Sequence, residues 1–307
     1  MKLRFVEDRR TLVWAGLLFP LSPALALWRP SLLPWLAPLL LYCSYLSGVL
    51  SHNHNHCPVF VSRRANLLYG AWLSFFYGFP SFAWVPSHNR NHHRFLNGKG
   101  DVSSTSLALT ADGIFAALSY PLVCSRHQLP LVVEYARAAW PSHPARARRV
   151  VLECAALLLG HGAALTFALL LHGLELGGLV YGFAIGLPAL MGNYWMMLTN
   201  YLQHVGCDPD SARAHSRNFV SPFWNWFVFD NGYHSVHHDQ PGLHWSKYRA
   251  AHRASLGRIE PALNHDFIVA YALRRYWPGA RRLASAAGDS RADGRRLRET
   301  PAVAPPS

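Results

Sequence analysis

The stretch from residue 31 to residue 56 reads SLLPWLAPLLLYCSYLSGVLSHNHNH. Its apolar part, residues 31–50, carries no charged side chain and is close to the roughly 20 residues that an α-helix needs to cross the hydrocarbon core of a bilayer. The histidines that follow directly would lie where such a helix leaves the hydrocarbon. The stretch therefore predicts a membrane-spanning helix that carries a group of metal-binding side chains at one end.

Three further apolar runs predict that the chain crosses the membrane four times. Residues 11–28 come directly before this stretch, with only Arg29 and Pro30 between, and residues 150–172 and 174–198 form a second pair. Two apolar runs joined by so short a turn predict a helical hairpin, whose outer ends lie on one side of the membrane. We expect an all-α integral membrane protein with four transmembrane helices in two hairpins.

Basic residues indicate which side of the membrane these outer ends occupy. They precede the two hairpins at Lys2, Arg4, Arg9 and Arg10, and at Arg146, Arg148 and Arg149. Lys and Arg beside membrane helices mark the cytoplasmic side, so both termini and the histidines are predicted to be cytoplasmic. A cleavable signal peptide is an alternative for residues 11–28, because Ala24-Leu-Ala26 is similar to a cleavage site. The acidic pair Glu7-Asp8 and the second apolar run argue against it.

The remaining segments are predicted to form a cytoplasmic helical cap. Residues 66–85 are apolar but contain two glycines and a proline, and a crossing there would separate the histidine clusters, so we expect an interfacial or shallow re-entrant segment. Residues 111–123 and 219–229 are too short to span the bilayer and are expected at the interface. Residues 1–278 would form one domain, followed by a disordered tail, 279–307, rich in Arg, Ala, Ser and Pro.

The composition favours a membrane protein over other classes. Of the 307 residues 51% are hydrophobic, and the net charge is +13. The basic residues are scattered beside apolar runs, which does not favour nucleic-acid binding. Five cysteines without a CxxC pair support neither a disulfide framework nor a zinc ribbon. Histidine, with 18 copies against 16 acidic residues, is the abundant ligand type.

Three histidine clusters follow apolar segments. They are His52-Asn-His54-Asn-His56, His88-Asn-Arg-Asn-His92-His93 and His234-Ser-Val-His237-His238. Residues three or four apart on a helix share one face, so each cluster contains a pair that is expected to approach one ion together. These pairs are His52/His56, His88/His92 and His234/His238.

The other histidines of the clusters have different expected directions. His54 lies two positions from each neighbour and should point away from the metal, whereas His93 and His237 can turn toward a second metal. Eight well-placed imidazoles remain when His54 is left out, which is more than one ion uses. Two metal ions are therefore predicted.

Ligand type alone does not name the metal, because imidazole suits iron, copper, nickel and zinc. The sequence contains no ExxH and no HExxH, which argues against a carboxylate-bridged bundle and a zinc peptidase. One alternative is that interfacial histidines only solvate helix ends, as we expect for the isolated His161 and His172. Another is a metal-binding membrane transporter or sensor, but transporters hold ions near the bilayer midplane.

At these residues the sequence resembles the membrane fatty-acid desaturase and hydroxylase superfamily. Its pattern is HxxxH, then HxxHH or HxxxHH, then HxxHH, and the three clusters match these boxes in order, the second in its HxxxHH form. The likeness runs from about residue 41 to residue 248. The context of the third box, Asn231-Gly-Tyr-His-Ser-Val-His-His-Asp-Gln-Pro, is typical of the superfamily.

The resemblance implies a mushroom-like helical fold with a di-iron centre in its cytoplasmic cap. Asn200-Tyr-Leu-Gln-His204 is similar to a further ligand motif of acyl-CoA desaturases, in which the histidine binds iron and the asparagine acts through water. The predicted ligands are thus His52, His56, His88, His92, His93, His204, His234, His237 and His238, with Asn200 through water. Asparagines within the boxes, together with His215 and His244, would support the ligands or be bystanders.

The implied chemistry is reductive activation of dioxygen at two irons and removal of hydrogen from an unactivated methylene. We rank desaturation of a fatty acyl lipid or acyl thioester first, and hydroxylation or ketolation of an alkyl, sphingoid or carotenoid chain second. No haem, flavin or iron–sulfur motif is visible, and no HPGG-type haem module. A separate electron donor is therefore expected, and a small acidic ferredoxin would suit the basic surface.

The topology can be tested with reporter fusions. Four crossings and the basic flanks predict that both termini and every histidine box face the cytoplasm. Reporters placed after Ser62 and after Asp101 should both read as cytoplasmic. A reporter at either position that reads as external would contradict the two-hairpin topology.

Overall fold

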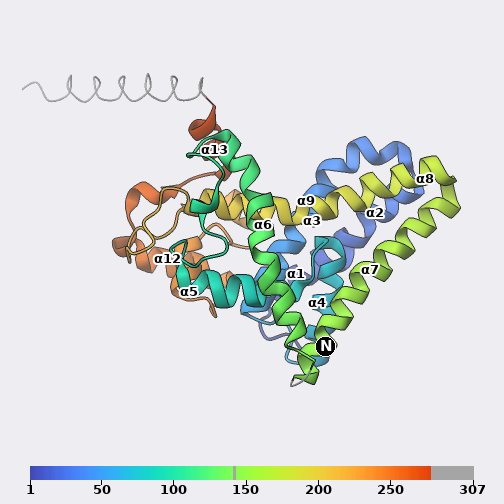
Figure 1. The fold of residues 1–307 in the computed structure, drawn as a ribbon, viewed down its shortest axis with the longest axis horizontal. Coiled ribbons are helices and arrows are strands. Elements are labelled where there is room, and N and C mark those ends of the chain that lie inside the picture. Colours follow the sequence, from blue (N-terminus) through green and yellow to red (C-terminus); the bar gives the residue numbers. More distant parts are fainter. Residues whose placement is uncertain (141–142, 278–307) are drawn as a thin grey trace, which may run out of the picture.

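The computed structural model describes residues 1–140 and 143–277, and these are mostly helical (Figure 1). The predicted tail, residues 279–307, and the domain boundary at residue 278 lie outside the described residues. Strand structure in the described part is one parallel pair of two-residue strands, β1 (Asn218–Phe219) and β2 (Asn264–His265). The all-α prediction is confirmed for this part of the chain.

Four helices are long and apolar enough to cross a membrane. They are Asp8–Trp28, Pro30–His56, Pro144–His172 and Leu174–His204. This confirms the four predicted apolar runs. Two of the predicted ends were wrong, because the second helix continues past residue 50 through the first histidine box and the fourth past residue 198 to His204. Hydropathy marks only the part of a helix that lies in hydrocarbon, whereas backbone hydrogen bonding continues into polar residues.

The first and fourth of these helices are each interrupted by a π-helical turn. The first consists of α1 (Asp8–Val13), η1 (Trp14–Leu18) and α2 (Phe19–Trp28), and the fourth of α8 (Leu174–Tyr181), η6 (Gly182–Gly186) and α9 (Leu187–His204). Each π-helical turn ends two residues before a proline, Pro20 or Pro188. A proline ring clashes with the carbonyl four residues earlier and supplies no N–H, and widening the preceding turn relieves this clash.

Exposed apolar side chains on α7 (Pro144–His172) support a membrane environment. Leu158, Leu159 and Leu170 are 71%, 72% and 82% exposed. Contiguous apolar surface of this kind is uncommon on soluble proteins and is favourable against lipid. In Figure 1, α7, α2 and α8 lie together at one end of the molecule, and α5 and α12 lie at the other.

The segment before the second histidine box, residues 66–85, is divided into a short helix and further turns of helix. Residues 66–85 do not form one helix, because α4 (Arg63–Tyr77) ends at Gly78, which has a left-handed φ of 72°. The chain then continues through η3 (Ser81–Ala83) and the π-helix η4 (Val85–His92) to α5 (His93–Phe95). The 15 residues of α4 are fewer than a span needs, in agreement with a segment that does not cross.

The two segments predicted to lie at the interface have different lengths from those expected. Residues 111–123 form only part of α6 (Ile114–Arg137), since the helix continues through its less apolar second half. Residues 219–229 contain the end of β1 and α10 (Pro222–Phe227). In both cases a hydropathy pattern showed apolar residues but not where helical hydrogen bonding begins and ends.

The remaining elements bring the third histidine box against the first two. A turn, η5 (Thr105–Leu107), precedes α6, and the box forms α11 (His234–Asp239). The last described elements are η7 (Trp245–Lys247), α12 (Tyr248–Ser255), η8 (Leu256–Arg258), η9 (Pro261–Leu263) and α13 (Ile268–Tyr276). The N-terminal segment is fixed to this region, because buried Asp8 accepts hydrogen bonds from His244 and Trp245.

The helices α3 (Leu33–His56) and α9 approach each other closely at a glycine. A Cβ on Gly192 would lie 2.8 Å from the Tyr77 carbonyl oxygen and 2.5 Å from Ser44 Oγ. Ser44 Oγ in turn donates a hydrogen bond of 2.5 Å to the Pro188 carbonyl. Backbone atoms cannot move away from an added methyl group without displacing a helix, so this contact fixes the distance between the helices that carry the first histidine box and His204.

We expect Gly192→Val to destabilise the protein by about 1–3 kcal/mol, the usual cost of overpacking a core. Gly162→Val is the matched control, because a Cβ on Gly162 meets nothing within 4 Å. Thermal unfolding of detergent-purified protein, followed by size-exclusion chromatography, measures the difference. Equal stability of the two variants would contradict this account of the α3–α9 contact.

Candidate metal centre

The first histidine box occupies the last two turns of α3. His52 and His56 lie four residues apart and face the interior, with ring centroids 4.9 Å apart. His54 faces the other way, as predicted: its Nε2 lies 3.2 Å from the Asn66 carbonyl oxygen, and its ring packs on Tyr69. The α-helical period decides this, because residues two apart point to nearly opposite sides.

The second box does not pair its histidines as the sequence predicted. His88 and His92 were expected to approach one ion, but the structure places them in different groups. The box begins on the π-helix η4, where hydrogen bonds join residues five apart rather than four. His88 therefore meets His93, with their Nε2 atoms 3.1 Å apart, and His92 turns toward the other group. An α-helical period was the wrong assumption here.

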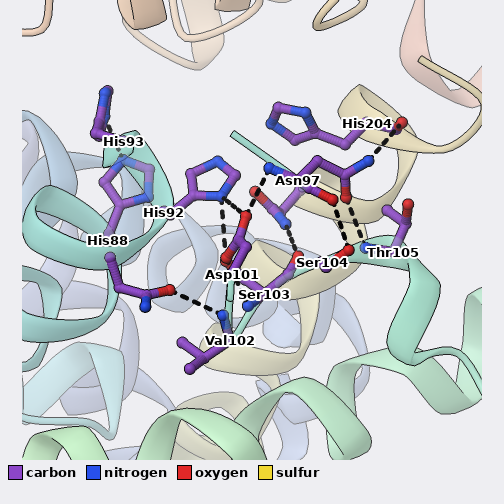
Figure 2. A network of polar contacts seen from close by, with 12 residues as sticks. His88, His92, His93, Asn97, Asp101, Val102, Ser103, Ser104, Thr105 and His204 are labelled. Atoms are coloured by element: carbon purple, nitrogen blue, oxygen red, sulfur yellow. Dashed lines mark hydrogen bonds and ion pairs between the residues drawn. The ribbon is translucent and has the colours of Figure 1, made fainter. Parts of the chain in front are cut away.

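A left-handed turn after the second box brings a carboxylate to His92. Leu96 and Asn97 have φ angles of 44° and 69°, which is rare for residues other than glycine. The chain thereby folds back, and Asp101 Oδ2 accepts hydrogen bonds of 2.7 Å from His92 Nδ1 and from the Asn97 backbone N–H. Figure 2 shows Asp101 between these two residues, with Ser103 beside it. Strained turns of this kind persist where the surrounding contacts fix them.

A second strained turn positions the third box. Phe229 and Asp230 have φ angles of 50° and 55°. The turn is fixed by Asn225, whose Oδ1 accepts from the Gly232 backbone N–H at 3.0 Å. At the start of α11, the Ser235 backbone N–H donates to Asn218 Oδ1 at 2.9 Å. These contacts orient the helix so that its histidines face those of the other boxes.

The structure brings the histidines together in two groups. In each group one possible ligand atom per residue lies within 4.8 Å of all the others: His52, His56, His88 and His237 in the first, and His92, His204, His234 and His238 in the second. His93 adds a fifth ring to the first group, with its Nε2 at 3.1 Å from His88 and 2.9 Å from His237. All nine histidines named from the sequence thus converge, as groups of five and four.

The spacing of the ring nitrogens fits a metal ion better than hydrogen bonds. The Nε2 atoms of His52, His88 and His237 lie 2.9, 3.1 and 3.2 Å from one another, and those of His204, His234 and His238 lie 2.9, 3.0 and 3.2 Å apart. Three nitrogens in a triangle cannot all be joined by straight N–H···N bonds. Ligands at right angles on metal–nitrogen bonds of ~2.1 Å lie about 3.0 Å apart, which matches.

Unpartnered buried nitrogens point to the same conclusion. His56 Nε2 and His92 Nε2 are buried and have no hydrogen-bond partner among the described residues. Each belongs to one of the two groups. A buried polar atom without a partner costs about 1–3 kcal/mol, and metal coordination would remove this cost. The residues present therefore fit one metal ion in each group.

Comparison with known proteins identifies the family. The family model described as Fatty acid desaturase matches residues 12–267, which include all nine histidines. The chain belongs to the fatty acid desaturase family. No curated protein and no solved structure matches the chain. Family membership and the four apolar helices together make this desaturase-family chain an integral membrane protein of oxidoreductase type, and the family is generally di-iron.

Burial favours the neutral form of five histidines that lie outside the spanning helices, namely His88, His93, His234, His237 and His238. Burial, with the neighbouring histidines, lowers the pKa of His88, His234, His237 and His238 well below the usual range. The pKa of His93 is lowered to about 3, mainly by burial and to a smaller extent by the neighbouring His92 and His52. A neutral imidazole has a free lone pair, which is the form that binds metal.

Further polar groups fix the orientation of the ligand rings. Tyr248 Oη lies 3.1 Å from His237 Nδ1, Asn53 Oδ1 lies 3.2 Å from His52 Nδ1, and the His215 carbonyl oxygen lies 3.2 Å from His204 Nδ1. Such partners set which ring nitrogen faces the metal. Asn53 and the His215 backbone thus lie beside rings of the two groups, whereas the His215 side chain pairs with Asp239 and His244 pairs with Asp8.

Sequence reasoning missed Asp101, the carboxylate beside His92. Burial alone would raise the pKa of Asp101, but His92 and hydrogen bonds from His92 and Ser103 lower it below the usual range, so it stays ionised. Its position nine residues after His92 corresponds to no helical or strand period, and only the left-handed turn brings the two together. The one feature of the sequence that could have pointed to Asp101 is that an acidic residue follows the second histidine box closely.

Asn200 has partners other than the histidines. Its Nδ2 donates to Tyr120 Oη at 3.0 Å and lies 3.4 Å from the Ser103 carbonyl oxygen. The residue is buried, one turn before His204 on α9. The water-mediated role predicted for Asn200 stays a prediction.

His204→Ala and His54→Ala should have opposite effects on bound metal. We expect His204→Ala to lose roughly one iron of two, because the group of four would keep only three imidazoles. His54→Ala should keep both irons, since its ring faces away. Iron analysis of folded, detergent-purified variants measures this, and unchanged iron with full turnover in His204→Ala would reject its assignment as a ligand.

Proposed function

We propose that this chain is an oxygen-dependent di-iron oxidoreductase of the membrane that introduces a double bond into a fatty acyl chain. The observation that carries the proposal is the convergence of nine histidines in groups of five and four within a chain of the fatty acid desaturase family. Two irons bound there would supply the reductive activation of dioxygen that removal of hydrogen from an unactivated methylene requires.

The two groups of histidines would hold one iron each. Five ligands would bind the first, namely His52, His56, His88, His93 and His237, and four would bind the second, namely His92, His204, His234 and His238, with Asn200 through water. Imidazole ligands suit iron. The second iron would have one histidine ligand fewer than the first. Asp101 would hold the His92 ring in place through Nδ1.

A large apolar cavity supports an acyl substrate. Its volume is about 630 Å³, within the usual range for ligand sites. The lining comes from α3, α9, α10 and α13 and from Ile114 at the start of α6, and includes Leu41, Tyr45, Leu198, Thr199, Leu202 and Trp224. Because α3 and α9 also carry His52 and His204, a chain bound there would run toward the metal centre. Tyr45 precedes His52 by two helical turns, or ~10 Å.

One side of this cavity is closed by α13. The helix contributes Ile268, Ala272 and Tyr276 to the lining. Asp112, which lies just before α6, holds it in place: its Oδ1 accepts hydrogen bonds from Tyr276 Oη at 2.8 Å and from Tyr201 Oη at 3.1 Å, and Arg275 pairs with the other oxygen. The apolar wall excludes water from the bound chain, which favours reaction with substrate over loss of reducing equivalents.

Electrons would come from a separate protein. Forming one double bond while reducing dioxygen to two waters consumes two electrons and two protons besides the two hydrogens taken from the substrate. A small acidic ferredoxin fits the net charge of +13, and electrostatic steering of this kind weakens as salt concentration rises. We further propose that the termini and the metal centre lie on the cytoplasmic side, where such a donor is available.

Lipid analysis of cells that express the protein tests the proposed reaction. We expect a lipid acyl chain that has lost two hydrogens, and no such product with the variant His92→Ala. A product that has gained one oxygen instead would replace desaturation by hydroxylation. Absence of any modified lipid, with a competent donor and bound iron present, would reject the proposed function.

The apolar cavity gives a separate prediction. Ala272→Trp would fill part of the cavity and should lower turnover at least tenfold while the bound iron stays unchanged, because Ala272 lines the cavity and the cavity lining includes no histidine of either group. Ala254→Trp on α12 is the matched control, since this exposed alanine does not line the cavity. Product formation and iron content of both variants are measured together. Full activity of Ala272→Trp would show that the acyl chain binds elsewhere.

A further inference from the structure

A second large cavity lies on the other side of the first histidine box. Its volume is about 660 Å³, and it shares no lining residue with the apolar cavity. Its walls come from the N-terminal segment, the end of α3, α4 and the start of α7, which Figure 1 shows close together near the N-terminus. The lining residues that matter here are Arg4, Arg63, Arg64, Arg148 and Arg149, with His54, Asn55 and Asn66.

The cavity has a strong positive charge that the protein leaves largely unbalanced. Five arginines line it and no carboxylate does. Arg149 is paired with Glu153 at 2.7 Å, and its Nη2 donates to Asn55 Oδ1 at 2.7 Å. Within the described residues, the Arg63, Arg64 and Arg148 side chains form no ion pair. A cleft lined by one sign of charge concentrates ions of the opposite sign.

Hydrogen bonds fix the side chains that form the wall of this cavity. His54, which does not face the metal centre, is buried in this wall and held at both ring nitrogens, by the Val59 N–H at 3.4 Å and the Asn66 carbonyl oxygen at 3.2 Å. Asn66 in turn accepts from the Phe60 N–H at 2.9 Å and donates to its carbonyl oxygen. The third histidine of the first box thus supports the cavity instead of binding iron.

The cavity lies where the apolar helices begin. Arg148 and Arg149 come directly before residues 150–172, the apolar part of α7. Beyond the arginines, α4 and α7 expose apolar side chains: Leu68 is 61% exposed and Val151 51%. An amphiphile with an anionic head would therefore find cations at its head and apolar surface along its tails.

We propose that this cavity binds the phosphate headgroup of an anionic membrane lipid, with the acyl tails along the exposed faces of α4 and α7. Guanidinium groups bind phosphate oxygens through paired N–H donors, and several arginines from different elements can surround one phosphate. Basic pockets between membrane helices are a recognised form of anionic-lipid site. The site does not depend on the proposed oxidation, because it shares no residue with the histidine groups or the apolar cavity.

The acidic surface of an electron donor is the rival occupant. The structure favours lipid for two reasons. The arginines line a concave cavity of small-ligand size rather than a broad surface, and exposed apolar residues follow them. The acidic surface of a donor protein would not cover the exposed apolar faces of α4 and α7, whereas lipid tails would.

Native mass spectrometry of the detergent-purified, iron-loaded protein tests the proposal. The probes are dioctanoyl phosphatidylglycerol, dioctanoyl phosphatidylcholine and inorganic phosphate. The test variant combines Arg63→Gln, Arg64→Gln and Arg148→Gln, and the control combines Arg213→Gln, Arg253→Gln and Arg258→Gln, which remove the same charge from exposed sites outside the cavity. Iron content checks that each variant is folded.

We expect wild type and control to bind phosphatidylglycerol at least tenfold more tightly than phosphatidylcholine or inorganic phosphate, and the test variant to lose this preference. If the test variant does not fold, the three lysine substitutions at the same positions replace it and should weaken binding less. Equal binding by test variant and wild type, or no preference for phosphatidylglycerol, would overturn the proposal. A test variant that loses affinity for reduced ferredoxin but keeps lipid binding would assign the cavity to the donor instead.

Discussion

The rest of this structure depends on the convergence of nine imidazole rings, whose nitrogens approach one another to about 3 Å within each of the two groups. Water would solvate and protonate such a cluster, so the rings have to be buried. Partners at the second ring nitrogen then fix the ring orientation. Asp101, Tyr248 and the His215 carbonyl oxygen lie at the Nδ1 atoms of His92, His237 and His204.

The backbone shows what this convergence requires. Four residues other than glycine, Leu96, Asn97, Phe229 and Asp230, have left-handed φ angles, and they lie directly beside the second and third boxes. A π-helix carries part of the second box. These features are individually unfavourable, by on the order of 1–3 kcal/mol each, and persist only where other contacts determine them. Metal bound at the two groups would contribute to the free energy of folding, since its ligands come from segments far apart in the chain.

The same two helices connect the metal centre to the proposed substrate site. The spans Pro30–His56 and Leu174–His204, which end with α3 and α9, are longer than the hydrocarbon core, so their apolar parts can line a cavity for an acyl chain while their last turns carry His52, His56 and His204. Close packing at Gly192 keeps the two helices in register. The opposite side of α3 faces the basic cavity, so one helix separates the two cavities and supplies side chains to both.

The sequence by itself determined the four apolar helices, the histidine boxes and the outward direction of His54. Each of these follows from a local property, either the apolar length that a bilayer requires or the α-helical period. Tertiary structure alone decided that His88 pairs with His93 rather than His92, that His204 meets His234, and that Asp101 supports His92. These contacts depend on a π-helical turn and on left-handed turns that fold the chain back. Such turns are stabilised by packing between distant segments, which no spacing within one segment reveals.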